Sequence, residues 1–486
     1  MGCCFGKQAS FRKKHSGKDD VDIEPGLFVS ANKLKFIDVY EIGRSLGQGG
    51  YGEVREATHR DSGQLRAVKI FTKENTNSMP EAELLNEVNV MKSIDHPNIV
   101  RIFEYFDSIK KAYIVMELCK GGELFDEIIK RRQFSEDDAA SVAKQLFSAV
   151  DYLHEHNVIH RDLKPQNILL ENKGELNSIK VSDFGIAKVS KRFKRLNEVI
   201  GTAYFMAPEV ISGKYNFKCD LWSCGVIIYM MLSGHPPFQA RNQEELFVKI
   251  SKRDWSFREP VWAEVSRHAK DLISALLSPM ETRLNAKEAL AHPWIQRVCP
   301  EIQNTQSLEP ALDNLKGFQS KGKLRDALST FITLHCISND DTRGLKEVFR
   351  SIDKNGDGKL SKAELMEQYI KFMGQEEAKE EVKKIMKEVD TDKSGFIDYT
   401  EFLKASMDQR RLMSVGNLKA AFAMFDKDKN GTITKKEIKD AIGEDGRVLD
   451  KIWRDIISEL DTNGDGEIDF EEFENVIMGK MPRNHI

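Results

Sequence analysis

The chain of 486 residues is long enough for about three globular units, and its 40% hydrophobic and 31% charged residues are typical of a protein that buries a core. A formal net charge of -4, from 73 basic and 77 acidic residues, argues against nucleic acid as a partner. Seven scattered cysteines without zinc-like spacing indicate a reducing, cytoplasmic compartment. No apolar run of about 18 residues occurs, so the sequence predicts no membrane span.

Residues 1–39 form a polar, basic arm for which we expect no fixed structure. Gly2 resembles a myristoylation acceptor, and Cys3 and Cys4 resemble palmitoylation sites. Gly6 departs from the usual motif, which has serine or threonine there. One acyl chain binds a membrane only marginally, so stable association with an inner leaflet would need both modifications. The alternative is an unmodified arm.

A strand-rich part and then a helical part follow, and together they span residues 40–295. Glycines and β-branched residues over 40–70 predict strands and hairpins, and 112–118 predicts a buried strand. Helical periodicity occurs over 81–94 and, with interrupting loops, from 135 to 294. The pattern predicts an α+β domain.

Five motifs occur within this domain in a fixed order. They are Gly47-Gln48-Gly49-Gly50-Tyr51-Gly52-Glu53-Val54, Ala67-Val68-Lys69, His160-Arg161-Asp162-Leu163-Lys164-Pro165-Gln166-Asn167, Asp183-Phe184-Gly185 and Ala207-Pro208-Glu209. The glycine loop alone is a weak signal, although glycines let a backbone approach phosphates closely. The ordered set resembles the protein-kinase signature, which implies a two-lobed kinase fold with ATP and Mg²⁺ as ligands.

The resemblance implies that Lys69 holds the α- and β-phosphates, a task for which a carboxylate must orient its ammonium group. Glu87 in the predicted helix is the candidate. The alternative for Glu87 is a solvated charge, since Glu81 and Glu83 lie nearby.

The same resemblance assigns the phosphotransfer chemistry to four further residues. Asp162 would accept the proton of the substrate hydroxyl, and Lys164 would steady the γ-phosphate. Asp183 and Asn167 would bind Mg²⁺. Lysine at position 164 is typical of serine/threonine kinases. Because no signature position is missing, we expect an active enzyme.

Further positions complete the expected nucleotide site. The loop over the phosphates comprises Gly47, Gln48, Gly49, Gly50, Tyr51, Gly52, Glu53 and Val54. The adenine would lie between Leu46, Val54, Ala67 and Leu169, beside a hinge marked by Met116, Glu117 and Cys119. Asp220 and Arg283 resemble structural residues of the helical lobe.

Two features concern activation and substrate choice. Arg161 would pair with Glu198, which would replace a phosphorylated residue in the activation segment; the alternative is another acid or solvent. Glu123 would contact a basic residue upstream of the target serine or threonine. Gln166 weakens any preference for several upstream arginines, because it replaces an acid often found there.

Residues 296–340 form a bridge with the pattern of a basic amphipathic helix. Its apolar residues recur at helical spacing: Leu308, Ala311, Leu312, Leu315, Phe318, Leu324, Ala327, Leu328 and Phe331. A helix of this kind fits the apolar groove of an acidic calcium sensor.

After residue 340 an acidic motif repeats in steps of 37, 36 and 35 residues and matches the twelve-residue EF-hand loop, whose oxygen atoms bind Ca²⁺. The first loop offers Asp353, Asn355, Asp357, the Lys359 carbonyl, Ser361 and Glu364. The second offers Asp390, Asp392, Ser394, the Phe396 carbonyl, Asp398 and Glu401. The third offers Asp426, Asp428, Asn430, the Thr432 carbonyl, Thr434 and Glu437. The fourth offers Asp461, Asn463, Asp465, the Glu467 carbonyl, Asp469 and Glu472.

Two other loop positions support the match. The sixth position is always glycine: Gly358, Gly395, Gly431 and Gly466. The eighth position, where paired loops exchange a short β contact, holds Leu360, Ile397, Ile433 and Ile468. The repeats predict an all-α, calmodulin-like domain with EF-hand pairs at 341–410 and 411–486. Carboxylate counts alone favour tighter binding by the second and fourth loops.

The kinase motifs, the bridge and the four EF-hand loops, in this order, resemble the calcium-dependent protein kinases of plants and protists over about residues 40–480. The resemblance implies a serine/threonine kinase that its bridge inhibits at low calcium and its own EF-hands release. By this resemblance, Lys321, Lys323 and Arg325 would take part in the inhibition of the kinase by the bridge. The alternative is that these three side chains are only solvated charges. Pseudosubstrate inhibition and distortion of the Lys69–Glu87 pair both stay open.

Two alternative functions are weaker. A calcium sensor with a non-catalytic kinase domain as scaffold is disfavoured by the intact residues Lys69, Asp162, Asn167 and Asp183. A kinase that needs external calmodulin is disfavoured because a tethered sensor has the higher effective concentration. We expect a monomer.

Overall fold

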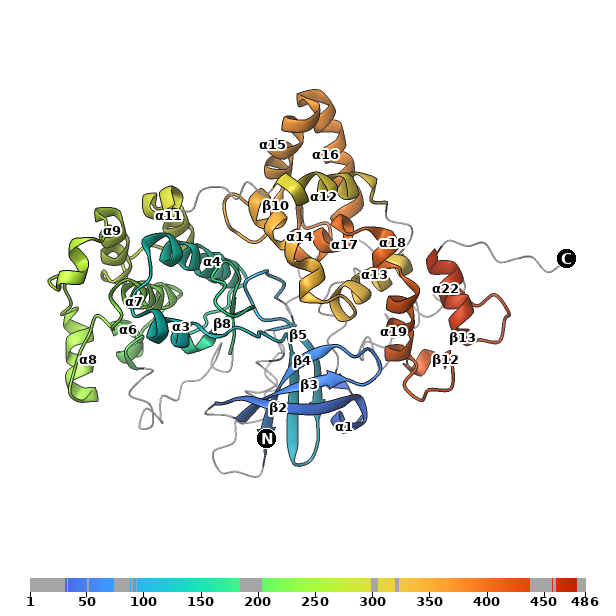
Figure 1. Ribbon diagram of the computed structural model, residues 1–486, viewed down its shortest axis with the longest axis horizontal. Helices are drawn as coiled ribbons and strands as arrows, with labels where there is room; N and C mark the ends of the chain where they lie inside the picture. Colours follow the sequence, from blue (N-terminus) through green and yellow to red (C-terminus); the bar gives the residue numbers. More distant parts are fainter. Residues whose placement is uncertain are drawn as a thin grey trace, which may run out of the picture.

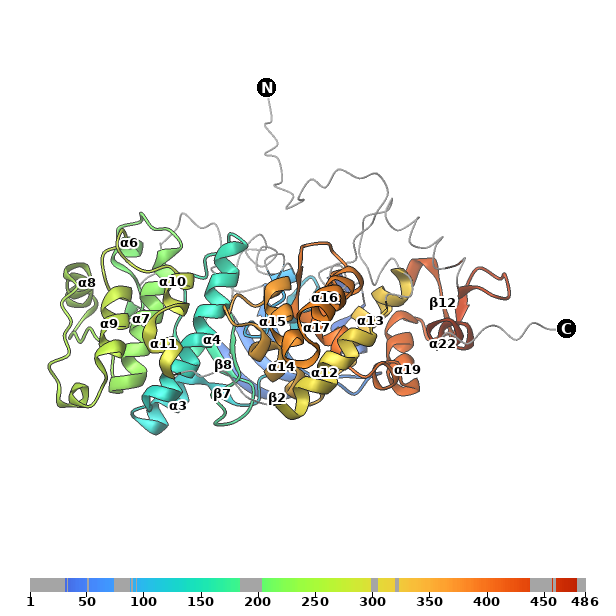
Figure 2. The same ribbon diagram turned by 90° about the horizontal axis from the view of Figure 1, so that it is seen from above.

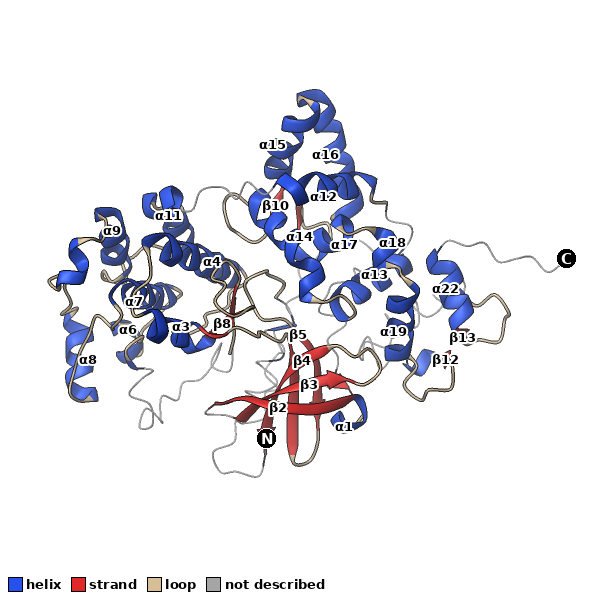
Figure 3. Ribbon diagram, viewed as in Figure 1, coloured by secondary structure: helices blue, strands red, loops and turns tan. Residues whose placement is uncertain are grey.

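The fold is known from a computed structural model. It describes residues 31–32, 34–49, 52–73, 88, 91–92, 94–183, 203–298, 305–319, 323–437, 457 and 460–478. A helical lobe lies at one end of the long axis and the second EF-hand pair at the other (Figures 1 and 2). Strands gather in one large sheet, and helices dominate elsewhere (Figure 3). The predicted fold class, a two-lobed α+β kinase followed by an all-α EF-hand domain, is confirmed.

The first lobe is a six-stranded sheet with the order β1-β5-β6-β4-β3-β2. Its strands are β1 (Ala31–Asn32), β2 (Tyr40–Gly49), β3 (Gly52–His59), β4 (Leu65–Thr72), β5 (Ile102–Asp107) and β6 (Lys111–Met116). All neighbours are antiparallel except β1 and β5. One face buries an aromatic cluster, in which Phe36 of α1 (Phe36–Val39) stacks on Tyr40 and Tyr113. The predicted strands are thus present.

The second lobe is built on two long helices and a small sheet. Its strands are β7 (Gly122–Glu123), β8 (Ile168–Leu170) and β9 (Ile179–Val181). Its helices are α3 (Leu124–Arg131), α4 (Glu136–Glu155), α6 (Pro208–Ile211), α7 (Lys218–Ser233), α8 (Gln243–Lys252), α9 (Arg267–Leu276), α10 (Ala286–Leu290) and α11 (Pro293–Val298). Helix α7 is buried nearly throughout and packs against α4 and α9. Ser135 begins α4, because its side chain accepts the Asp138 N–H.

The bridge forms two helices, α12 (Thr305–Gly317) and α13 (Lys323–His335), so the prediction of one helix is wrong. Glycine is a weak helix former, and α12 ends at Gly317. The apolar residues of the two helices also enter different hydrophobic clusters, although both helices pack against the last helix of the first EF-hand pair, Tyr399–Ser406. Leu312 of α12 packs with the first EF-hand pair, whereas Phe331 of α13 packs with the second.

The EF-hand domain is helical apart from two short sheets. The first pair comprises α14 (Asn339–Ile352), β10 (Leu360–Ser361), α15 (Lys362–Met373), α16 (Gln375–Val389), β11 (Phe396–Ile397) and α17 (Tyr399–Ser406). The short helix α18 (Gln409–Leu412) leads to the second pair, which includes α19 (Val415–Phe425), β12 (Thr432–Ile433), β13 (Ile468–Asp469) and α22 (Phe470–Met478). Within the described ranges, no helix has the length and apolar character needed to cross a membrane.

Candidate active site and calcium sites

The catalytic loop brings three predicted residues into contact. The Lys164 ammonium group donates a hydrogen bond to Asp162 Oδ2 at 2.8 Å. Asn167 Nδ2 donates to the same oxygen at 3.0 Å and to the Asp162 carbonyl at 2.8 Å. Asn167 ends the 3-10 turn η2 (Pro165–Asn167), and Pro165 favours this turn because its φ angle is fixed. The Asp162 carboxylate is thereby held by two donors, which fixes the direction in which it can accept a proton.

The buried carboxylate of Asp220 binds the backbone of the catalytic loop. Asp220 of α7 accepts the backbone N–H groups of His160 and Arg161 at 3.0 and 2.9 Å, and it contacts His154 Nε2 at 2.8 Å. Burial disfavours the charged form, but these hydrogen bonds outweigh burial and hold the pKa of Asp220 below its ordinary value. The two backbone hydrogen bonds stabilise Arg161 at a φ of 70°, a conformation that non-glycine residues rarely adopt.

We expect Asp220→Asn to lower kcat roughly ten- to hundredfold, because the amide loses the charge-assisted hydrogen bonds to two backbone donors. Steady-state phosphorylation of a peptide, with thermal unfolding measured in parallel, checks this. The exposed Asp137→Asn serves as the matched control. A kcat within twofold of the wild-type value would contradict the supporting role.

Arg283 is buried to 1% exposure and lies far from the catalytic loop in sequence. Its guanidinium group pairs with the carboxylate of Glu209, in the Ala-Pro-Glu motif, and donates to the Lys218 carbonyl at 2.8 Å. The pair ties the end of the activation segment to the helical lobe, which agrees with the structural role expected for Arg283.

Lys69 and Asp183 meet between the two lobes. Lys69 Nζ, on the central strand β4, lies 2.7 Å from Asp183 Oδ1. Burial disfavours the charged carboxylate, but the Lys69 ammonium group outweighs burial and lowers the pKa of Asp183. The N–H of Ser182 donates to the Asn167 carbonyl at 2.9 Å, which places Asp183 beside Asn167. A carboxylate and an amide oxygen so placed fit Mg²⁺, a cation that prefers oxygen ligands.

The predicted nucleotide-binding residues come from both lobes. Strand pairing sets Val54 opposite Lys69 and Ala67 opposite Met116. Leu169 lies on β8 and packs, like Cys119, at the edge of the large core. Leu46 lies on β2 and is partly exposed.

The hinge residue Glu117 has a side chain that turns away from the nucleotide side. Its carboxylate is buried and pairs with Lys180 Nζ at 2.9 Å. Its backbone N–H donates to the Arg101 carbonyl. The side chain of Glu117 therefore stabilises the hinge through its pair with Lys180, and this side chain is not positioned as a direct ligand of ATP.

The glycine loop is the tip of the β2–β3 hairpin. The register pairs Gly47 with Val54, Gln48 with Glu53, and Gly49 with Gly52. A Cβ atom at Gly52 would lie 2.1 Å from the Ile70 carbonyl oxygen, so only glycine fits this position. Several predicted residues lie outside the described residues: Gly50, Tyr51, Glu87, Glu198 and Lys321.

Glu123 precedes α3 at the edge of the catalytic lobe. Burial raises the pKa of its carboxyl group, and the neighbouring Asp126 carboxylate adds to that shift. Strand pairing sets Glu123 opposite Leu169, two residues after Asn167 of the catalytic loop. Two acids next to the catalytic loop form a partly exposed negative patch.

The four EF-hand loops share one hydrogen-bond scheme. The carboxylate at the first position accepts the glycine N–H at 2.9–3.0 Å in every loop. The last glutamate accepts the N–H of the second position through one oxygen and that of the ninth through the other. Each position-six glycine has a positive φ of 79° to 91°. The glutamate thus closes each loop, and Glu364, Glu401 and Glu472 lie in the first turn of α15, α17 and α22.

The loops also pair as predicted, since Leu360 lies opposite Ile397 and Ile433 opposite Ile468. Carboxylate oxygens converge within 4.8 Å of one another at Asp390, Asp392 and Glu401, and at Asp426, Asp428 and Glu437. Burial, together with the nearby Asp392, raises the pKa of Glu401 to about 7. Crowded carboxylates of this kind, of which Glu401, Asp426 and Glu437 are buried, fit Ca²⁺, which takes six to eight oxygen ligands.

The bridge is held by the EF-hands. Leu312 and Leu315 of α12 are buried in the cluster of the first pair, and Phe331 and Ile332 of α13 in that of the second. Tyr369 adds a hydrogen bond from its hydroxyl to the Leu312 carbonyl at 2.8 Å. The side chains at positions 321–324, which include Lys321 and Lys323, are outside the described part, whereas Arg325 is partly buried.

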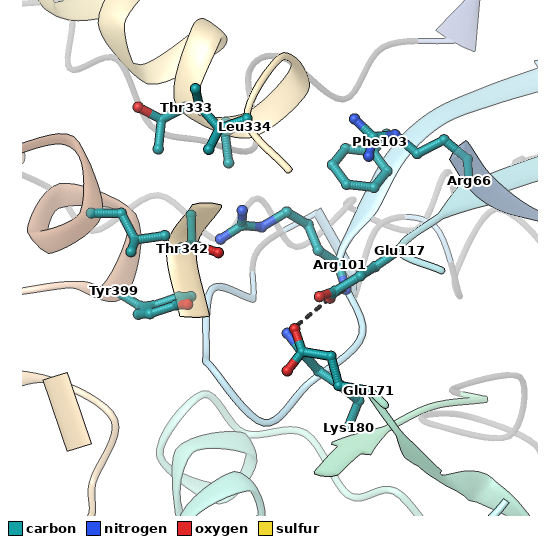
Figure 4. Close-up of a pocket in the computed structure, with 12 residues that line it drawn as sticks. Arg66, Arg101, Phe103, Glu117, Glu171, Lys180, Thr333, Leu334, Thr342 and Tyr399 are labelled. Atoms are coloured by element: carbon teal, nitrogen blue, oxygen red, sulfur yellow. Dashed lines mark hydrogen bonds and ion pairs between the residues drawn. The ribbon is translucent and has the colours of Figure 1, made fainter. Parts of the chain in front are cut away.

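The EF-hand domain also contacts the kinase lobes directly, which sequence reasoning missed. Asp95 Oδ2 accepts the Thr400 N–H at 2.8 Å at the start of α17, and Arg101 joins both residues. A Cβ atom at Gly358 would lie 2.0 Å from the His96 ring, so the first calcium loop touches the kinase. A pocket between the domains is lined by Arg66, Arg101, Phe103, Glu117, Glu171, Lys180, Thr333, Leu334, Ile337, Thr342, Tyr399 and Leu403 (Figure 4).

Comparison with known proteins extends this picture. Residues 40–295 match the protein kinase domain family, and residues 342–407 and 417–478 match the EF-hand domain pair. Calcium-dependent protein kinase 4 of Plasmodium falciparum is 38% identical over 472 residues, which cover 94% of this chain and 89% of the relative. Calcium-dependent protein kinase 14 of Arabidopsis thaliana is 38% identical over 438 residues, which cover 89% and 82%. The chain therefore belongs to the calcium-dependent protein kinases, and it is a calcium-regulated serine/threonine kinase that uses ATP, Mg²⁺ and Ca²⁺.

Proposed function

We propose that the described arrangement, in which the EF-hands hold both bridge helices, is the catalytically active one, and that the bridge blocks the kinase at low calcium. The observation that carries this proposal is the burial of Leu312, Leu315, Phe331 and Ile332 against the two EF-hand pairs. A helix whose apolar stripe is covered in this way is held away from other partners. Calcium would shift the balance toward capture, because loaded sensor EF-hands open apolar grooves.

The roles of the catalytic residues follow from their placement. When bound, Mg²⁺-ATP supplies the phosphoryl group and much of the neutralising charge. Lys164 and Asn167 hold the Asp162 carboxylate in place, and this carboxylate accepts the hydroxyl proton of the substrate. Lys69, which pairs with Asp183 in this structure, would bind the phosphates of ATP, and Asp183 would bind Mg²⁺.

Substrates are proposed to be proteins with a serine or threonine that follows a basic residue. Support comes from the negative patch of Glu123 and Asp126, which is at least partly exposed and lies at the start of α3, where Glu123 pairs with Leu169 after the catalytic loop. The proposed enzyme works as a monomer, without external calmodulin and without nucleic acid. Comparing peptides with arginine or alanine upstream, on wild type and Glu123→Gln, would reveal whether Glu123 sets this preference.

The switch is tested by measuring phosphate transfer from Mg²⁺-ATP to a basic serine peptide with calcium chelated and then restored, with no calmodulin added. Activity only with calcium supports a self-contained switch. Equal activity under both conditions would exclude the regulatory account and retain the kinase.

Bridge capture makes a specific prediction. Leu315→Asp places a charge at a fully buried position of α12 and should lower calcium-stimulated activity at least tenfold, because burying an unpaired charge is strongly unfavourable. Lys316→Asp, on the exposed face of the same helix, is the matched control. Wild-type calcium stimulation in Leu315→Asp would show that the capture of α12 is dispensable.

Membrane association is proposed for the N-terminal arm, through acyl chains on Gly2, Cys3 and Cys4. These residues precede the described part of the chain. The proposal is supported by the sequence motif, which offers acceptors for two kinds of acyl chain, and by the fact that one acyl chain alone binds a membrane only marginally. Metabolic labelling with myristate and palmitate, repeated on Gly2→Ala and on the double variant Cys3→Ser, Cys4→Ser, decides between a membrane-associated and a purely cytoplasmic enzyme.

A further inference from the structure

Helix α14, which enters the first calcium loop, carries three basic residues on one face. Arg343, Lys346 and Arg350 are spaced by three and four residues, which aligns their side chains along the helix. All three contact the kinase at the same element, the hairpin that joins β8 to β9.

Each basic residue has its own partner on the hairpin. Lys346 Nζ lies 2.5 Å from the Glu171 carboxylate and 2.7 Å from Ser178 Oγ. Arg343 pairs with Glu175 at 2.5 Å. Arg350 donates a hydrogen bond to the backbone carbonyl of Asn177. The three contacts span the whole hairpin turn.

Burial shows which contact matters most. The side chains of Lys346 and Glu171 are 5% and 10% exposed, whereas Arg343 is 51% exposed and its pair is screened by solvent. Burial disfavours the Glu171 carboxylate, but the ammonium groups of Lys346 and Lys180 outweigh burial and lower its pKa. Without Lys346, the buried Glu171 carboxylate would have only the Lys180 ammonium group nearby, which already pairs with Glu117, and such a loss is unfavourable.

The hairpin is also the connection between the residues placed to bind Mg²⁺. Strand β8 begins directly after Asn167, and β9 ends two residues before Asp183. The Glu171 carbonyl accepts the N–H of Lys120, just after the hinge, at 2.9 Å. The hairpin residue Lys180 pairs with the hinge residue Glu117, as Figure 4 shows. A contact that fixes this hairpin therefore acts on the hinge and on both metal-binding positions.

We propose that Lys346 is a positioning residue for ATP: by pairing with Glu171 it holds the β8–β9 hairpin, and through it the hinge and the Asn167–Asp183 pair, in the geometry that binds the nucleotide. The sensor then acts on the nucleotide site by direct contact as well as by removing the bridge. This inference rests on the proposal that the described arrangement is the active one.

The test uses the full chain at saturating calcium and compares wild type, Lys346→Met and Lys346→Arg. We expect Lys346→Met to raise KM for ATP about tenfold, within the range of couplings between contacting residues, with a smaller effect on KM for the peptide. Lys346→Arg keeps the charge and should restore most of the ATP affinity. Lys387→Met, on a side chain that is 83% exposed on α16, is the matched control.

Direct titration with a fluorescent ATP analogue gives a readout apart from turnover, and calcium binding and thermal unfolding report whether each variant is folded. If Lys346→Met does not fold, Lys346→Gln carries the same test, since it removes the charge and keeps a hydrogen-bond donor. A folded variant with wild-type KM for ATP, or one that loses only kcat, would overturn the inference. A wild-type chain equally active with and without calcium would instead overturn the proposed switch, so the two failures are distinguishable.

Discussion

Asp162→Asn should lower kcat for peptide phosphorylation by about 10²–10⁴-fold while leaving KM for ATP nearly unchanged. The carboxylate is held by the Lys164 ammonium group and by Asn167 Nδ2, so an amide at this position still fits the space. It can no longer accept the proton of the substrate hydroxyl. The loss should therefore fall on the chemical step, because the residues that would hold the nucleotide are untouched.

Single-turnover phosphorylation of a serine peptide, with ATP binding measured separately, checks this result. Asp137→Asn, at an exposed position in the first turn of α4, controls for the loss of one carboxylate. If Asp162→Asn kept kcat within threefold of wild type, Asp162 could not be the base, and positioning alone would have to explain the rate.

Glu401→Gln and Glu437→Gln should each raise the calcium concentration for half-maximal activation by about tenfold or more, since ligand charge helps to set calcium affinity. Each glutamate closes its loop by accepting one N–H from the second position and one from the ninth. Glutamine replaces one acceptor oxygen with an N–H₂ group that faces a donor. The loop therefore loses both a calcium ligand and its own closure.

Calcium titration by calorimetry, alongside activity measured at fixed free calcium, checks this prediction. Glu380→Gln, exposed on α16, is the matched control, because it removes the same charge outside any loop. Unchanged calcium binding in both loop variants would contradict the ligand assignment. Full activity of either variant at very high calcium is expected, since the kinase lobes are intact.

Local patterns predicted much of the fold and of the two kinds of site. Glycine positions, loop spacing and strand periodicity depend on neighbours in the chain, and the pairing of Leu360 with Ile397 was predicted for this reason. The bridge was predicted as one helix, because periodicity continues across the break after Gly317. The stripe alone does not show that its two halves enter different hydrophobic clusters.

The contacts between the EF-hands and the kinase were not predictable in the same way. Lys346 and Glu171 are 175 positions apart, and each looks like an ordinary surface charge in its own segment. The spacing of Arg343, Lys346 and Arg350 could have indicated a basic helix face, but nothing local identifies an acidic hairpin as its partner. Only the folded arrangement shows that these charges are buried together.

The contacts of the EF-hand domain with the kinase limit how freely this protein can be recombined. A tethered sensor whose only task was to bind the bridge helices could be exchanged for another sensor that binds the same helices. Here the first calcium loop also fits the surface of the catalytic module, with no room for even one added carbon atom at Gly358. A foreign sensor would also have glycine at this position, because the EF-hand turn requires it. A chimera would therefore be limited by the other contacts of the domain with the kinase, such as the hydrogen bond from the Thr400 N–H to Asp95.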